Sequence, residues 1–166
     1  MKKAKSIRKF SEKCNYLCHH NILLVDDENM NIMMLFALFS NLSFNPIVAN
    51  NAMEATKIFQ RKLRATCCLN KFELIMTDIQ MPEIDGLKFA QMIRGTEESW
   101  AAQLALKSRA GRLKSQHSCP IIAVTAHQDH SRESLEEAGI DGVIYKPVQK
   151  EELVTVIRQY LFSQNN

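Results

Sequence analysis

The sequence predicts an α/β fold in which a doubly wound, five-stranded parallel sheet has helices on both faces. From residue 21 onward, short apolar runs alternate with longer stretches whose apolar residues recur every three or four positions. Five such strand–helix units predict a parallel sheet that is buried on both sides. Right-handed crossovers leave few topologies, and we expect the common strand order 2-1-3-4-5.

The five predicted strands are short apolar segments. They are NILLV (21–25), PIVA (46–49), FELIMT (72–77), IIAVT (121–125) and GVIY (142–145). Pro46 opens the second strand, and proline is tolerated on an edge strand. This agrees with the outer position of the second strand in the expected order.

Between and after the strands, apolar residues return at helical spacing. The predicted helix positions are Ile32, Leu35, Phe36, Phe39 and Leu42; Ala52, Ala55, Phe59 and Leu63; Leu87, Ala90 and Ile93; Leu135 and Ala138; and Leu153, Val156, Ile157, Tyr160 and Leu161. Residues at this spacing lie on one face of a helix. Each helix is therefore expected to cover the sheet with that face.

One domain is the expectation for 166 residues with 46% hydrophobic and 23% charged side chains. We assign residues 1–19 to a basic N-terminal tail or linker and residues 20–166 to the domain. Residues 95–119 are an insertion, because an αβ connection usually takes about two to six residues. The part from Glu97 to Arg109 could extend the third helix or form its own. The Ser-, Gly- and basic-rich second half favours a partly mobile insertion.

Composition indicates a cytoplasmic protein. No stretch approaches the roughly 20 apolar residues that span a bilayer, and no secretory signal is present. The five cysteines are odd in number and scattered, which is a poor disulfide framework. CNYLCHH (14–20) could bind zinc, but free thiols in a linker are favoured. The basic tail lacks interleaved aromatics, so we expect a solvated linker and no nucleic-acid partner.

Polar residues stand at the carboxyl ends of four predicted strands. Asp26 and Asp27 follow the first strand, Asp78 the third and Lys146 the fifth, while Thr125 ends the fourth. Singly, each could be a helix cap, a strand residue or a surface lysine. Ligands of an open parallel sheet bind outside these strand ends, where the strand order reverses. We therefore expect the five side chains to gather at one edge of the sheet.

Three neighbouring carboxylates imply a cation. Each close pair costs on the order of 4 kcal/mol at an effective dielectric near 20. Oxygen ligands suit Mg²⁺, and Mn²⁺ could substitute. With the charge covered by the metal and Lys146, Asp78 is a plausible nucleophile toward phosphorus. Thr125 and Lys146 would then bind phosphoryl oxygens.

Four segments together resemble the receiver domain of two-component response regulators, over about residues 20–162. They are VDDE (25–28), DIQMPEIDG (78–86), VTA (124–126) and KP (146–147). The resemblance implies a flavodoxin-like fold and a phosphoacceptor, Asp78. The donor would be a phosphohistidine on a histidine kinase or a histidine phosphotransfer protein. The downstream protein partner is not indicated.

The resemblance also assigns roles around Asp78. Asp27, Asp78 and the backbone carbonyl of Gln80 would bind Mg²⁺, and Asp26 would act through water. Thr125 and Lys146 would contact the phosphoryl group. The resemblance further implies a cis Lys146–Pro147 peptide bond and a loop shaped by Pro82 and Gly86, with Gly86 opening the third helix.

Asn31 after DDE, together with DIQMPEIDG, is similar to receivers fused to hybrid sensor histidine kinases. We expect the chain to be part of such a kinase, and the alternative is that it is a single-domain response regulator. A docking module that transfers no phosphate is a further alternative. So is an aspartyl-phosphate phosphatase, although Gln80 stands where such an enzyme needs an acid. The chain is not expected to be a stand-alone enzyme beyond its own phosphoryl transfer and dephosphorylation.

Two positions depart from the family pattern. Val143 stands three residues before Lys146, where the family often has an aromatic ring that swings inward. Tyr145 is next to Lys146 and, by strand alternation, should face the opposite side. Readout through an aromatic rotamer is therefore not expected. His127 stands near the predicted site, and an exposed loop histidine is favoured over a role in phosphate lifetime.

Overall fold

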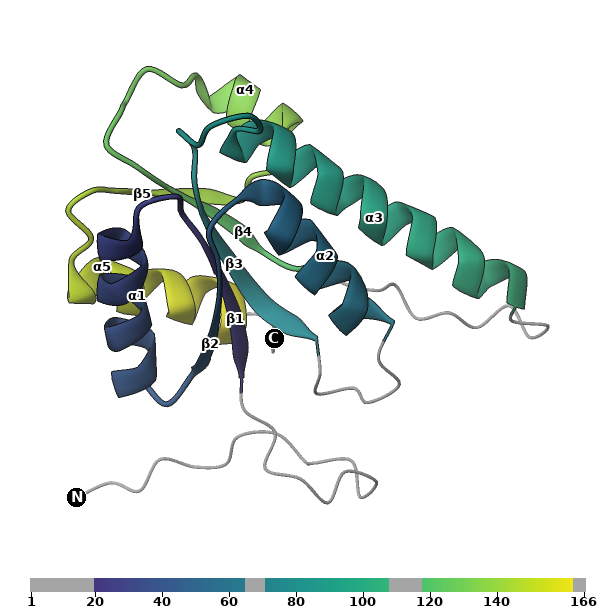
Figure 1. Cartoon of the computed structure of the whole chain (residues 1–166), viewed down its shortest axis with the longest axis horizontal. Helices are drawn as coiled ribbons and strands as arrows, with labels where there is room; N and C mark the ends of the chain where they lie inside the picture. The colour runs from purple at the N-terminus through teal and green to yellow at the C-terminus, as the bar shows by residue number, and fades with distance from the viewer. Residues whose placement is uncertain (1–19, 65–70, 108–117, 163–166) are drawn as a thin grey trace.

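The computed structural model describes residues 20–64, 71–107 and 118–162 (Figure 1). Its five strands form one parallel sheet in the order β2-β1-β3-β4-β5, which confirms the predicted topology. The strands are β1 (Asn21–Val25), β2 (Asn45–Ala49), β3 (Phe72–Asp78), β4 (Ile121–Thr125) and β5 (Gly142–Tyr145). The helices are α1 (Asn29–Asn41), α2 (Ala52–Leu63), α3 (Gly86–Lys107), α4 (Arg132–Glu137) and α5 (Lys150–Ile157), and α5 continues into a π-helical turn (Arg158–Phe162).

Helices cover both faces of the sheet, as the alternation along the strands requires. Side chains of successive strand residues point to opposite faces. In β1, Leu23 joins a core cluster with residues of α2 and α3, while Leu24 joins a second cluster with residues of α1 and α5. Figure 1 shows α1 and α5 on one side of the sheet and α2 and α3 on the other. The doubly wound architecture is therefore confirmed.

Local capping explains where two of the helices begin. The Asn51 side chain accepts from the Glu54 N–H at 2.8 Å, and the Glu54 carboxylate accepts from the Asn50 N–H at 2.9 Å. The first bond satisfies an N–H group that the first turn of α2 leaves without a helical partner, and the second ties the residue before the cap to the helix. Ser131 caps α4 in the same way, accepting from the Ser134 N–H at 3.1 Å.

Helix α1 departs from its predicted buried face at one position. Ile32, Leu35 and Phe39 are buried, but Phe36 is 44% exposed. Three methionines of the same helix also face outward: Met30, Met33 and Met34, which are 81%, 71% and 36% exposed. We call these four exposed side chains the α1 apolar surface.

The first part of the predicted insertion continues the third helix. Helix α3 runs without interruption through Lys107 and projects past the sheet (Figure 1). This is one of the two alternatives that the sequence left open. The stretch from Glu97 is rich in Glu, Ala, Leu and Gln, which are strong helix formers. The second part, residues 108–117, lies outside the described residues.

Several predictions from composition also fall outside the described residues. These are the tail at 1–19, with its possible zinc ligands before His20, and the cysteines other than Cys119. Cys119 is a buried free thiol, and its pKa is raised well above the usual value because burial disfavours the thiolate. Within the described ranges, no helix is long and apolar enough to cross a membrane.

Candidate functional site

The three predicted carboxylates gather at the carboxyl edge of the sheet. Carboxylate oxygens of Asp26, Asp27 and Asp78 lie within 4.8 Å of one another. The strand register accounts for this, because Val25 of β1 pairs with Thr77 of β3. The residues that follow, Asp26 and Asp78, therefore emerge side by side. Asp26 and Asp78 are buried, at 1% and 8% exposure, whereas Asp27 is exposed.

Lys146 bridges the two buried carboxylates. Its ammonium donates to Asp26 Oδ2 at 3.0 Å and to Asp78 Oδ2 at 2.7 Å. Burial by itself would lower the pKa of Lys146. The hydrogen bonds to Asp78 and Asp26 outweigh this effect, so the net direction of the pKa is upward. One ammonium balances one of the three carboxylates, and two negative charges remain.

Asn31 holds Asp26 from the first turn of α1. Its side-chain amide lies 3.1 Å from both carboxylate oxygens of Asp26, and the Glu28 N–H donates to Asp26 Oδ1 at 2.9 Å. The sequence reading used Asn31 only as a mark of resemblance and missed this contact. A signal was present, because Asn31 lies four residues before the buried Leu35 and so shares its helix face.

The loop after β3 is folded tightly beneath Asp78. The Gln80 N–H donates to Asp78 Oδ1 at 3.2 Å, and the Gly86 N–H donates to the Ile79 carbonyl at 2.8 Å. Gly86 begins α3, as the resemblance implied. A Cβ atom at Gly86 would lie 2.2 Å from the Asp78 carbonyl oxygen and 2.8 Å from Ile79 Cα. Only glycine fits between this loop and the start of α3.

Gly86→Ala is therefore expected to destabilise the fold by about 2 kcal/mol or more, because the added methyl group meets rigid backbone. The free energy of unfolding in urea measures this loss. Gly95→Ala is the matched control within the same helix, since a Cβ at Gly95 meets nothing within 4 Å. There we expect a gain of about 0.5 to 1 kcal/mol from helix propensity. Equal effects at the two positions would contradict the steric explanation.

Thr125 stands beside this cluster at the end of β4. Asp78 pairs with Val124 in the β3–β4 register, so Thr125 lies one residue further toward the edge. It is 1% exposed, and its Oγ1 accepts from the His127 N–H at 3.1 Å. Accepting this bond leaves the hydroxyl proton for donation to another oxygen. The Lys146 N–H donates to the Thr125 carbonyl at 2.9 Å, which joins β4 to Lys146.

The remaining expectations around Lys146 also have structural counterparts. The Lys146–Pro147 peptide bond is cis. Val143 is partly buried against the core, and Tyr145 is 42% exposed. The His127 ring is exposed as well, with Nδ1 4.0 Å from Asp129 Oδ1.

The donor set fits a hard divalent cation. Carboxylate oxygens are the ligands that Mg²⁺ prefers, and the exposed Asp27 leaves a side open to water and a further oxygen ligand. The residual charge of two negatives is equal in size and opposite in sign to the charge of such an ion. Asp26, Asp27 and Asp78 are the described carboxylates that can hold it.

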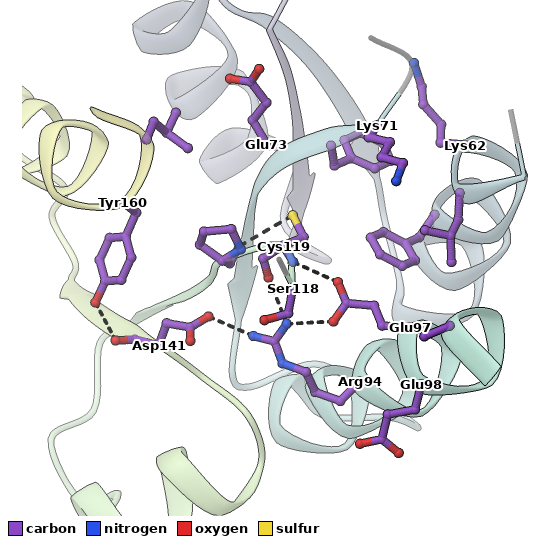
Figure 2. Close-up of a pocket in the computed structure, with 16 residues that line it drawn as sticks. Lys62, Lys71, Glu73, Arg94, Glu97, Glu98, Ser118, Cys119, Asp141 and Tyr160 are labelled. Carbon is purple, nitrogen blue, oxygen red and sulfur yellow. Dashed lines mark hydrogen bonds and ion pairs between the residues drawn. The ribbon is translucent and has the colours of Figure 1, made fainter. Parts of the chain in front are cut away.

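A cavity among the described residues lies elsewhere. It has a volume of about 720 Å³ and lies at the amino ends of β3 and β4, between α2 and α3 (Figure 2). Its lining includes Arg94, Glu97, Cys119 and Asp141, and none of the predicted site residues. The cavity is therefore not the predicted site.

Comparison with known proteins agrees with this geometry. The family model described as the response regulator receiver domain matches residues 22–105. The chain is 31% identical over 155 residues to probable histidine kinase 1 of Oryza sativa, and 31% identical over 150 residues to histidine kinase 5 of Arabidopsis thaliana. In both cases 84% of the chain is covered, but only 15% of the relative. The chain thus spans about 15% of the length of these kinases.

Solved structures share the fold. One is the receiver domain of a yeast response regulator (Saccharomyces cerevisiae), co-crystallised with a histidine phosphotransfer protein. It has a TM-score of 0.68 and 23% identity, with 88% of this chain and 91% of that chain covered. Another is the receiver domain of a sensor histidine kinase from Pseudomonas aeruginosa, with magnesium in its active-site cleft. It has a TM-score of 0.61 and 23% identity, with 86% and 97% covered.

Proposed function

Because the chain belongs to the response regulator receiver domain family, we propose that it is the phosphoacceptor of a two-component phosphorelay. In this proposal, Asp78 accepts a phosphoryl group from a phosphohistidine and thereby changes the affinity for a protein partner. One observation carries it: Asp78 is hydrogen-bonded to Lys146 and lies within a cluster of three carboxylates at the sheet edge. A docking module that transfers no phosphate has no need for that cluster.

The reaction requires the donor, a bound divalent cation and side chains that lie at this edge of the sheet. A carboxylate oxygen of Asp78 attacks phosphorus, and an oxygen–phosphorus bond forms as the phosphorus–nitrogen bond of the phosphohistidine breaks. The electron pair of the broken bond stays on the imidazole nitrogen, which then takes a proton. Lys146 and the Thr125 hydroxyl bind two of the phosphoryl oxygens. The product is an acyl phosphate on Asp78.

Asp26, Asp27 and Asp78 would hold Mg²⁺, or Mn²⁺ in its place, together with the backbone carbonyl of Gln80. The bound cation would neutralise the charge that accumulates on the phosphoryl oxygens. Asn31 fixes the orientation of Asp26 by hydrogen bonding, as an outer contact commonly does for a metal-binding carboxylate.

The conformational response to phosphorylation would not use the inward swing of an aromatic ring. Val143 occupies the position of the expected aromatic ring, and Tyr145 is already exposed. The response to phosphate is therefore assigned to Thr125 and Lys146, which are joined by a backbone hydrogen bond. A shift of these two residues would bias two conformations of the surrounding loops.

The donor is assigned to a histidine kinase or a histidine phosphotransfer protein. The curated relatives are histidine kinases, and the yeast receiver shares a crystal with a phosphotransfer protein. We favour a receiver that forms part of a hybrid histidine kinase, with a single-domain regulator as the alternative. Donor and receiver would meet in the cytoplasm, which agrees with the cysteine pattern.

Intact mass after incubation with acetyl phosphate tests the proposed function. With Mg²⁺, we expect the mass to increase by one phosphoryl group, and with EDTA we expect no increase. A second, Mg²⁺-independent adduct would point to a different acceptor. No adduct in Mg²⁺, with a phosphohistidine donor also failing, would favour a docking module.

Asp27→Asn is expected to weaken Mg²⁺ binding by about tenfold or more, because one of the carboxylate charges of the cluster is lost. Isothermal titration with MgCl₂ measures the affinity. The variant should fold normally, since Asp27 is exposed. Asp129→Asn is the matched control, because it neutralises an exposed carboxylate in the loop after β4 that is not in the cluster. An equal loss in the control would assign the effect to general surface charge.

A further inference from the structure

The connection from α3 to β4 is unusually long for an α/β protein. Helix α3 ends at Lys107, and β4 begins at Ile121. A short connection of about two to six residues fixes the start of the next strand by its own length. A connection of more than ten residues does not fix that start by its own length. Because β4 carries Thr125 at its other end, contacts at the entry of β4 add to its pairing with β3 and β5 in setting its position.

Two side chains from the middle of α3 hold the entry of β4. Glu97 Oε1 accepts from the Cys119 N–H at 2.8 Å, and Arg94 Nη1 donates to the Cys119 carbonyl at 2.9 Å. Arg94 also donates to Glu97 Oε2 at 2.9 Å. Both polar groups of the Cys119 backbone are thereby bound to one helix. We call this arrangement of Arg94, Glu97 and Cys119 the β4 clamp (Figure 2).

The clamp is braced by the segment that enters β5. Arg94 Nη2 donates to Asp141 Oδ2 at 2.7 Å, and the same oxygen accepts from the Ile121 N–H at 2.8 Å. Arg94 Nε and Nη2 also donate to the Gly139 carbonyl, at 3.0 and 2.7 Å. A Cβ at Gly139 would lie 2.6 Å from Arg94 Cγ, so glycine admits the guanidinium here. Figure 2 shows Asp141 and Glu97 on either side of Arg94.

The clamp is connected to the phosphoacceptor through rigid elements. Helix α3 begins at Gly86, whose N–H is bound to Ile79, the residue after Asp78. Arg94 follows eight residues later, about 12 Å along the helix axis. At its other end, the five-residue strand β4 is buried throughout and ends in Thr125. One continuous frame thus runs from Asp78 along α3 to Cys119 and back along β4 to Thr125.

We propose that Arg94 and Glu97 are positioning residues that set the axial position of β4, and with it the distance of the Thr125 hydroxyl from the phosphoryl group on Asp78. This rests on the proposed function and adds to it a role for residues at the opposite end of the sheet.

Glu97→Ala tests the proposal, because it removes the acceptor for the Cys119 N–H. We expect phosphoryl uptake from acetyl phosphate, at saturating Mg²⁺, to fall by about fivefold, since small misplacements of a catalytic group are costly. Glu97→Gln retains an Oε1 acceptor and should restore most of the rate. Glu98→Ala is the matched control, because Glu98 is the exposed neighbour and is outside the clamp. Circular dichroism verifies that each variant is folded at the assay temperature.

A double-mutant cycle separates positioning from stability. If Glu97 acts through Thr125, then Glu97→Ala should change uptake by less than about twofold in a Thr125→Ala background. A full additional loss in that background would overturn the proposal. So would wild-type uptake by Glu97→Ala despite a lower free energy of unfolding. Arg94→Lys, which keeps the charge but not the guanidinium fork, is the second variant if Glu97→Ala does not fold.

A second readout remains informative if the chain takes up no phosphate. The His127 N–H is bound to Thr125 Oγ1, so the His127 amide resonance reports on the Thr125 hydroxyl. Glu97→Ala should shift this resonance, and Glu98→Ala should not. Without wild-type uptake from acetyl phosphate or from a phosphohistidine donor the proposed function fails, whereas an unmoved His127 resonance in Glu97→Ala would refute the positioning role independently.

Discussion

Asp78→Asn is expected to abolish the phosphate adduct while the chain stays folded. The amide of asparagine is a far weaker nucleophile than a carboxylate, and no acyl phosphate can form on it. Its oxygen can still accept from the Gln80 N–H, as Asp78 Oδ1 does. One negative charge also leaves a cluster in which three carboxylates face one ammonium. We therefore expect the variant to be at least as stable as the wild type without Mg²⁺.

Intact mass after acetyl phosphate treatment measures the loss, and urea unfolding measures the stability. Asp85→Asn is the matched control, because it removes an exposed carboxylate from the same loop. That variant should take up phosphate like the wild type. A full adduct on Asp78→Asn would mean that a different residue is the acceptor. Loss in both variants would point to damage of the loop.

Lys146→Met is expected to have the second largest effect, on both chemistry and stability. The ammonium donates to two buried carboxylates, and methionine fills a similar volume without any donor. Removing one partner of a buried ion pair costs about 3 kcal/mol or more, because it leaves uncompensated charge. Phosphoryl uptake should fall by about 10²-fold, the order expected when a donor to a transition-state oxygen is removed.

Urea unfolding measures the loss of stability, and acetyl phosphate kinetics measure the loss of phosphoryl uptake. The pH dependence of stability separates the contribution of the Lys146 charge from that of its packing. The pKa of Lys146 is raised in the folded state, although burial alone would lower it. Its contribution is therefore fully present below about pH 10.4, the usual lysine value, and is lost as the pH rises through the raised pKa. The wild type and Lys146→Met should converge in stability at strongly alkaline pH. A constant difference there would assign the loss to packing.

The fold was predictable because each strand and helix leaves a pattern within a short stretch of the sequence. Strand runs such as NILLV and IIAVT are apolar throughout, as strands buried on both faces must be, and they alternate with helical periods. The placement of Asp26, Asp78 and Thr125 was predictable from the same strand pattern, because each residue stands at the carboxyl end of a predicted strand. Residues at the carboxyl ends of neighbouring parallel strands meet whatever fills the connections between them.

The rest depends on contacts between residues far apart in sequence. The hydrogen bonds of Arg94 to Gly139 and of Glu97 to Cys119 join positions 45 and 22 residues apart. No periodic pattern in the sequence predicts them. The continuation of α3 to Lys107 was left open because propensity alone does not choose between one helix and two. Phe36 was predicted on the face of α1 that covers the sheet, but it is exposed, because an apolar residue at helical spacing can still face solvent.

The α1 apolar surface makes the chain chemically sensitive in a way unrelated to phosphate. Met30 and Met33 are more exposed than any other described methionine, at 81% and 71%. Peroxide converts exposed thioethers to sulfoxides, which are polar and bulkier, while buried thioethers such as that of Met76 are shielded. Mild oxidation would therefore change the polarity of α1 and leave the core intact. The polarity of the α1 apolar surface thus depends on whether its methionines are oxidised.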